Sequence, residues 1–168
     1  MIRSRFGLTF AIALFFLHAG AQDCALQKGN DDFSNQPKLF TGFMDLQDVK
    51  LNIDATAKEI DYFFVISNRN ANCIGEASEA LFLFEGGKQK MTLRNTGGDN
   101  CEGFFHIMMK NGVTTPSTLQ KLATKKVVSI TFSDRNDKKT SVVLTPPLQE
   151  MLLKVSQCIA AESKTLIK

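Results

Sequence analysis

The chain has 168 residues, with 20 Lys and Arg side chains against 17 Asp and Glu, which gives a formal net charge of +3 at pH 7. Two of the basic residues, Arg3 and Arg5, lie at the N-terminus, and the remainder of the chain is close to neutral. This balance lacks the strongly basic character of a nucleic-acid-binding protein, so we expect no nucleic-acid partner. Lys121, Lys125 and Lys126 cluster in the sequence, as lysines at solvated helix ends and turns often do.

Residues 1–21 have the layout of a signal peptide. The two arginines precede an apolar run of 12 residues, from Phe6 to Leu17, and the small residues Ala19, Gly20 and Ala21 fit a signal peptidase site. We therefore expect cleavage between Ala21 and Gln22 and a secreted or periplasmic product. A membrane anchor is the alternative, but crossing a bilayer takes ~20 apolar residues. No second long apolar run follows, so we expect no membrane span in the mature chain.

Cleavage at that point leaves 147 residues, enough for one domain with a sizeable core. Residues 22–37 are polar and contain several turn formers, so we expect them to form an irregular lead-in. Residues 38–168 are expected to form a single β-rich domain that disulfides stabilise.

All four cysteines lie after the signal, and an exported protein meets an oxidising compartment, so we expect two disulfides. Cys73 and Cys101 flank a predicted hairpin, which brings them together, and Cys24 and Cys158 then pair by default. Metal binding would need closely spaced ligands, whereas no two cysteines are closer than 28 positions. We therefore expect neither a metal site nor a cofactor.

The mature chain is a series of short apolar runs bounded by turn residues, which predicts strands. Seven are expected, at residues 49–54, 62–66, 80–84, 88–94, 104–109, 127–132 and 140–144. The first alternates apolar and polar residues, as a half-exposed strand does. The second, Tyr62 to Ile66, is apolar on both faces, which indicates a strand buried on both sides or covered by a helix. Gly86 and Gly87 predict a two-residue turn, because both of its central positions need positive φ.

Two helices are expected. Thr115 followed by Pro116 is typical of a helix start, and a short helix would follow. Pro146 and Pro147 begin a longer, amphipathic helix at the C-terminus, whose apolar residues recur with 3.6-residue spacing. The sequence therefore predicts a mainly β (α+β) fold: an antiparallel sheet built from hairpins, sandwich-like or barrel-like, with the C-terminal helix packed on it.

His106 is the only histidine after the signal and therefore the only candidate for a histidine general base. It shares a strand face with Phe104 and Met108, neither of which can orient an imidazole. No serine lies in a Gly-x-Ser-x-Gly elbow. We therefore expect no catalytic residue, and a partner for His106 would have to come from a neighbouring strand.

These observations favour a non-enzymatic binding or interaction protein of the cell envelope or extracellular space, with an unknown protein or small-molecule partner. One alternative is a carrier that holds an apolar ligand in a barrel lined by its phenylalanines. We expect those phenylalanines to fill the core instead. The other alternative is a hydrolase that uses His106.

Overall fold

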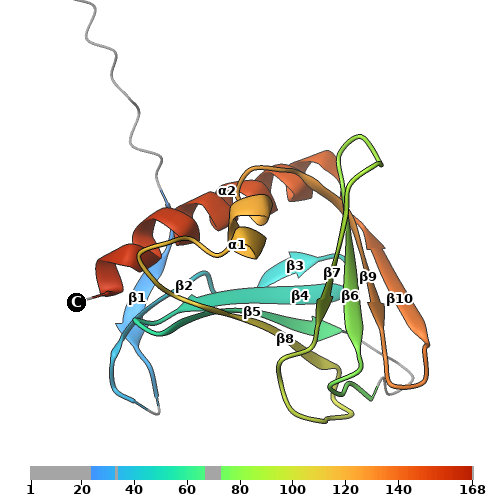
Figure 1. Ribbon diagram of the computed structural model, residues 1–168, viewed down its shortest axis with the longest axis horizontal. Coiled ribbons are helices and arrows are strands. Elements are labelled where there is room, and N and C mark those ends of the chain that lie inside the picture. Colours follow the sequence, from blue (N-terminus) through green and yellow to red (C-terminus); the bar gives the residue numbers. More distant parts are fainter. Residues whose placement is uncertain (1–23, 33, 67–72, 168) are drawn as a thin grey trace, which may run out of the picture.

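The computed structural model describes residues 24–32, 34–66 and 73–167. The predicted signal and its cleavage site at Ala21 and Gln22 lie outside these residues. Within them the fold is mainly β and sandwich-like, with ten strands in two antiparallel sheets, one short helix and one C-terminal helix (Figure 1). The predicted fold class is thus confirmed.

The first sheet has the strand order β1-β2-β4-β5-β8, and β3 pairs with the end of β4 that β2 leaves free. Its strands are β1 (Gln27–Asn30), β2 (Pro37–Phe40), β3 (Met44–Leu46), β4 (Val49–Ala55), β5 (Glu59–Ile66) and β8 (Phe104–Lys110). The second sheet has the order β10-β9-β6-β7. Its strands are β6 (Glu79–Phe84), β7 (Lys90–Arg94), β9 (Val127–Ser133) and β10 (Lys139–Val143). The helices are α1 (Ser117–Leu122), α2 (Pro146–Glu162) and a final 3₁₀ turn, η1 (Ser163–Leu166).

The described residues form ten strands where seven were expected, because β1, β2 and β3 precede the first expected strand, and one turn also differs. Residues 27–30, which we expected to be irregular, form β1 and pair with β2. Gly86 and Gly87 do have positive φ, 83° and 71°. However, β6 ends at Phe84 and β7 begins at Lys90, so the connection is longer than the predicted two-residue turn.

Strand β5 corrects one expectation that matters for function. Tyr62, Phe64 and Ile66 are buried on the inner face of the first sheet, as apolar residues at every second position should be. Phe63 and Val65 point the other way and are only partly buried. The strand is therefore not buried on both sides; its second apolar face is turned outward.

Phenylalanine rings join the two sheets across the core. Phe132 of β9 packs edge-to-face on Phe64 of β5 and on Phe105 of β8, with ring centroids 5.2 and 5.3 Å apart. Phe82 of β6 lies 6.4 Å from Phe64 in a similar arrangement. These geometries are favourable for aromatic pairs, so the rings fill the interior by contacting one another.

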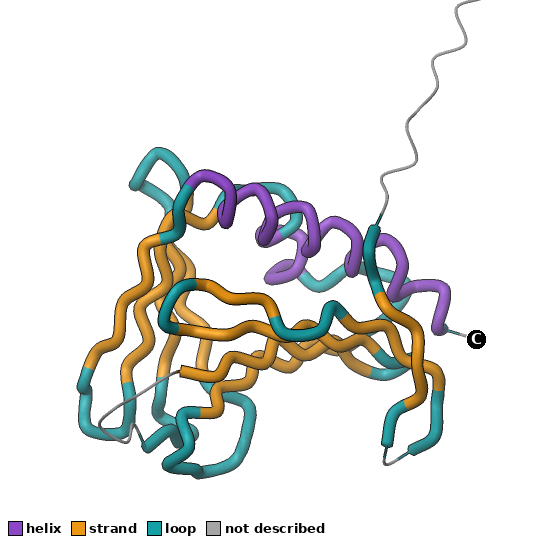
Figure 2. The backbone as a smooth tube through the Cα atoms, turned by 180° about the vertical axis from the view of Figure 1, so that it is seen from behind, coloured by secondary structure: helices purple, strands orange, loops and turns teal. Residues whose placement is uncertain are grey.

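Helix α2 runs along one side of both sheets and covers the inner face (Figures 1 and 2). It begins at Pro146 and Pro147, as predicted, and its Leu152 and Ile159 are buried. The hydroxyl of Tyr62 donates a hydrogen bond of 2.9 Å to Ser156 Oγ, which donates in turn to the carbonyl of Leu152. Burial raises the pKa of Tyr62, so the phenol stays protonated and remains a donor.

We predict unequal effects of the two substitutions at this contact. Tyr62→Phe removes the donor and leaves Ser156 bonded within the helix, so it should lower the free energy of unfolding by about 1 kcal/mol. Ser156→Ala leaves a buried phenol without its acceptor and should cost more, about 1–3 kcal/mol. Urea unfolding measures both values. If Ser156→Ala costs no more than Tyr62→Phe, the buried hydrogen bond is not as described.

Candidate functional site

The clearest candidate site is the outer aromatic face, which we define as Phe43, Phe63, Phe104, His106 and Met108. Among the described residues five large apolar side chains are exposed, and three of them lie here: Phe43 (59 %), Phe104 (38 %) and Met108 (38 %). Soluble proteins rarely group exposed apolar side chains without a use for them.

Strand register builds this face. β5 and β8 are antiparallel, with Phe63 opposite His106 and Val65 opposite Phe104. Because side chains alternate along a strand, Phe104, His106 and Met108 of β8 share the outer side with Phe63. Phe43, from the connection between β2 and β3, packs edge-to-face on Phe63 at 5.9 Å, and Phe104 does so at 5.5 Å from the other side.

His106 is held in place at the centre of the face. Its ring stacks on Phe63, with centroids 4.5 Å apart and 15° between the planes. Its Nδ1 lies 2.7 Å from Oδ2 of Asp61, on the neighbouring strand β5. Gly97 packs so closely that a Cβ added there would stand 2.6 Å from His106 Cδ2. These contacts hold the imidazole in place, and a larger residue at position 97 would displace it.

This geometry determines what His106 can offer a ligand. A carboxylate at Nδ1 accepts the proton of that nitrogen, so Nε2 is the ring atom left for a ligand, and in the neutral tautomer it is an acceptor. Within the described residues nothing bonds to Nε2, and no hydroxyl or thiol nucleophile contacts it. The structure thus supplies the orienting carboxylate that the sequence could not place, but not a nucleophile.

Asp54 and Asp61 lie directly opposite each other on β4 and β5, next to the outer aromatic face. Like charges in such cross-strand positions repel. Partial burial, followed by smaller effects that include the charge of Asp61, raises the pKa of Asp54. The amide of Asn52 donates a 3.0 Å hydrogen bond to Asp54 and partly offsets this. Asp61 Oδ1 is buried and has no partner among the described residues.

Side chains occupy the free edge of β8. Thr96 Oγ1 accepts from the N–H of Met108 and donates to the carbonyl of His106, and Asn95 accepts from the N–H of His106. Asn100 bonds both the N–H and the carbonyl of Phe104, at 2.9 and 2.8 Å. These bonds block pairing by a further strand, so access to β8 is through its face.

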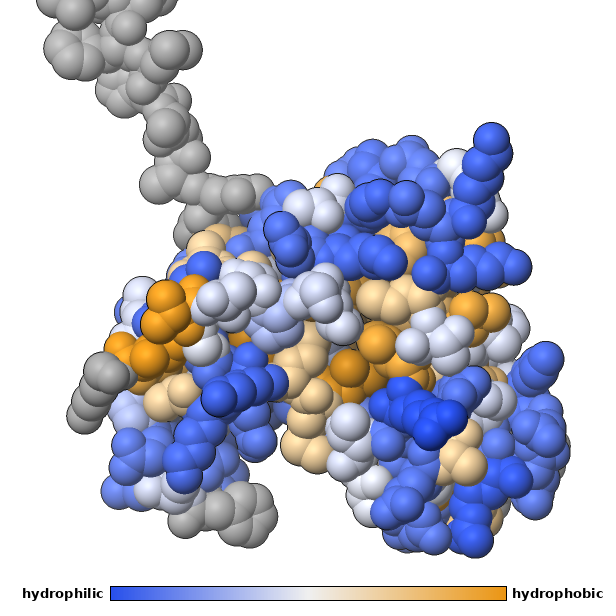
Figure 3. All heavy atoms as spheres, in the orientation of Figure 1, coloured by the Kyte–Doolittle hydropathy of each residue, from blue (hydrophilic) through white to orange (hydrophobic). Residues whose placement is uncertain are grey.

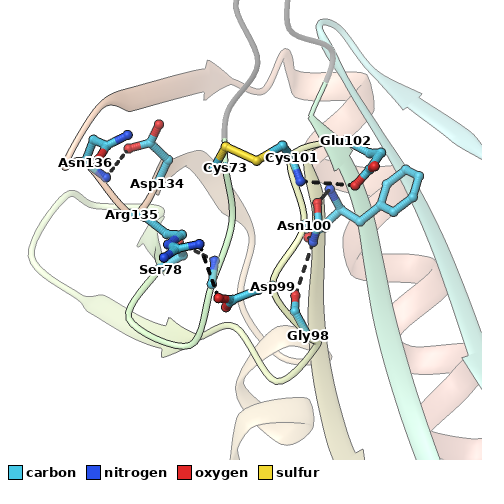
Figure 4. Close-up of a disulfide and its surroundings, with 12 residues drawn as sticks. Cys73, Ser78, Gly98, Asp99, Asn100, Cys101, Glu102, Asp134, Arg135 and Asn136 are labelled. Atoms are coloured by element: carbon cyan, nitrogen blue, oxygen red, sulfur yellow. Dashed lines mark hydrogen bonds and ion pairs between the residues drawn. A yellow bond between two sulfur atoms is a disulfide. The ribbon is translucent and has the colours of Figure 1, made fainter.

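A disulfide fixes the loops that carry these residues. Cys73 is bonded to Cys101, and the residues beside them, Ile74 and Asn100, form a β-bridge (Figure 4). Arg135, in the connection between β9 and β10, pairs with Asp99 at 3.2 Å. This corner holds Asn100 where it can bond Phe104, so the disulfide helps to position one end of the outer aromatic face.

The second disulfide joins Cys24 to Cys158, which ties the N-terminal segment to α2. Both pairs are those expected from the sequence. Two disulfides indicate an oxidising, extracytoplasmic environment.

In the described part of the chain no group of three or more His, Cys, Asp or Glu residues is placed to hold a metal ion. None of the described helices combines the length and hydropathy that a membrane crossing requires.

Sequence analysis identified His106, Phe104 and Met108 as sharing a face, but missed Asp61, Phe63, Phe43 and Gly97. Phe63 lies inside the strand expected at residues 62–66 and Asp61 lies directly before it, but five successive apolar residues give no signal that separates the inner from the outer face. The contacts of Asp61 and Phe63 with His106 depend on β5 pairing with β8. Comparison of the chain with protein-family models, curated proteins and solved structures gives no match.

The raised pKa of Asp54 predicts how stability depends on pH. A carboxyl whose pKa is higher in the folded than in the unfolded protein binds more protons when folded, so its contribution to stability falls as pH rises above about 4. Asp54→Asn should therefore raise the melting temperature at pH 7, and the gain should shrink toward pH 3. Thermal unfolding across this range measures it.

Asp45→Asn is the matched control, because Asp45 is exposed and its pair with Lys50 is long, at 3.9 Å. Exposed pairs of this kind contribute little to stability. A gain from Asp54→Asn that is the same at pH 3 and pH 7 would contradict the role assigned to its charge.

Proposed function

We propose that this protein is an exported, non-enzymatic binding protein of the cell envelope or extracellular space. A partner protein docks on the outer aromatic face. The observation that carries the proposal is the grouping there of three of the five exposed large apolar side chains among the described residues. Export rests on the signal-like residues 1–21 and agrees with the two disulfides.

The chemistry of the face favours a protein partner. Aromatic side chains and methionine are enriched in the buried centres of protein interfaces, and such centres contain few but well-placed polar groups. Here Phe43, Phe104 and Met108 supply exposed apolar area, and the fixed His106 supplies one polar atom, Nε2. A partner that places an N–H or O–H donor on Nε2 while covering the three apolar side chains satisfies both requirements.

The position of the face agrees with this function. It is the side of the first sheet turned away from α2, since the opposite side contacts that helix through Tyr62. The hairpin of β1 and β2 extends beyond it at one end, and the second sheet extends beyond it at the other (Figures 1 and 2). A partner docked on this side of the first sheet can therefore also contact the β1–β2 hairpin or the second sheet.

The test is a paired comparison of variants. Wild-type protein is used to capture its partner from the native medium or envelope, and the partner is then purified and titrated by calorimetry. Phe43→Ser combined with Phe104→Ser should weaken this binding at least tenfold, because both rings become buried in the complex. The melting temperature should fall modestly, since Phe104 is 38 % exposed and both rings contact Phe63, so binding is measured well below the melting temperature of the variant.

Val113→Ser combined with Val143→Ser is the matched control. These valines are also exposed, at 85 % and 67 %, but lie outside the outer aromatic face. The control should bind within twofold of wild type. Equal binding by both double variants would refute the face as the docking surface.

A further inference from the structure

A second surface feature is independent of the outer aromatic face. An open hollow of about 530 Å³ lies between the connection from β6 to β7 and the segment that follows α1. We call it the lysine hollow, because Lys88, Lys125 and Lys126 line it together with Glu85, Gln89 and Thr124. Its volume falls within the range of small-molecule sites, about 300–1,000 Å³. Figure 3 shows hydrophilic residues over the β6–β7 connection, where this hollow lies.

Folding brings these lysines together from separate parts of the chain. Lys88 comes from the β6–β7 connection, whereas Lys125 and Lys126 follow α1. The ammonium of Lys125 donates a hydrogen bond to Gln89, next to Lys88, and so joins the two segments. The sequence shows only the cluster of Lys121, Lys125 and Lys126; the addition of Lys88 is a result of the fold.

The charges in the hollow do not cancel. Lys126 pairs with Glu150 at 2.5 Å, a contact that also raises the pKa of Lys126, so its charge is compensated. Lys125 bonds the neutral amide of Gln89, so no acid is paired with it there. Lys121 lies one turn before Lys125, with its ammonium 5.8 Å from the centre of the Phe84 ring. Within the described residues, Lys88, Lys121 and Lys125 form no ion pair.

Among the residues that line the hollow, Glu85 is the one acid, set against the two uncompensated cations Lys88 and Lys125; Lys121 lies nearby in α1. Like charges that folding holds near one another, at positions such as i and i+4, destabilise the folded state. A bound anion removes that repulsion and gains the attraction of each ammonium. Lysine ammonium groups commonly bind phosphate. They do so as point charges, whereas arginine forms two parallel hydrogen bonds.

We propose that the lysine hollow binds a phosphate group, carried either by a small phosphorylated molecule or by a lipid headgroup. Lys88 and Lys125 contact the phosphate oxygens from opposite sides of the hollow, and Lys121 adds long-range attraction. The site does not use the outer aromatic face, so it stands or falls separately from the binding function proposed above.

The first experiment titrates the purified protein with inorganic pyrophosphate at low ionic strength, followed by amide NMR. Shifts should concentrate at residues 86–89 and 124–126. Lys88→Gln combined with Lys125→Gln should weaken binding at least tenfold, whereas Lys58→Gln combined with Lys110→Gln should change it less than twofold. The control removes two exposed lysines that lie away from the hollow, so it corrects for net charge. Raising the salt concentration should weaken wild-type binding, because exposed charges are screened.

A second arm distinguishes the sources of phosphate. Sedimentation with vesicles of phosphatidylcholine and phosphatidylglycerol, against vesicles of phosphatidylcholine alone, reports headgroup binding. Binding to soluble pyrophosphate alone assigns a small phosphorylated ligand. Binding to anionic vesicles alone assigns a lipid headgroup. Either result supports the site if the Lys88 and Lys125 double variant no longer binds that probe. The proposal is overturned if wild type binds neither probe, or if this variant and the control lose binding equally.

Discussion

The structure depends on one constraint: the first sheet can bury only one of its two faces. Its inner face is committed to the core, where Phe64 and Phe105 meet Phe132 of the second sheet and Tyr62 meets Ser156 of α2. Strands alternate their side chains, so each inward residue of β5 and β8 fixes an outward neighbour. The outward neighbours include phenylalanine and methionine. Polar residues at these positions would be enough to form the sheet. The fold therefore holds an apolar surface in water, supported by a core that does not depend on it.

That surface is rigid because its supports are. Phe63 contacts both Phe43 and Phe104 and carries the stacked ring of His106, while Asp61 bonds Nδ1 of that ring. Asn100 and Thr96 occupy the edge of β8, and the Cys73–Cys101 disulfide holds the loop from which Asn100 comes. A surface whose side chains are already ordered loses little conformational entropy on binding. Placing Asp61 beside His106 also places it opposite Asp54, and the repulsion between these two carboxylates destabilises the folded protein.

Local sequence signals predicted a large part of this fold. Short apolar runs bounded by turn residues located seven of the ten described strands, and two prolines with a 3.6-residue stripe located α2. A hairpin between Cys73 and Cys101 pointed to the disulfide pairs that the structure contains. Strand β1 was missed because its residues are polar and show no strand pattern. It is a strand because its backbone pairs with β2. The outward position of Phe63 was missed because five successive apolar residues show no alternation. The contact of Asp61 with His106 was out of reach, since these residues meet only when β5 pairs with a strand that follows two others in the chain.

Hydroxyl-radical footprinting tests the two-faced sheet most directly, because β8 contains two pairs of identical neighbours on opposite faces. Phe104 and Met108 are each 38 % exposed, whereas Phe105 is fully buried and Met109 is 9 % exposed. Oxidation should therefore be faster at Met108 than at Met109, and faster at Phe104 than at Phe105, in the folded protein with both disulfides intact. Since a shift of one residue in register would turn every side chain of β8 to the other face, the reverse order would contradict the account.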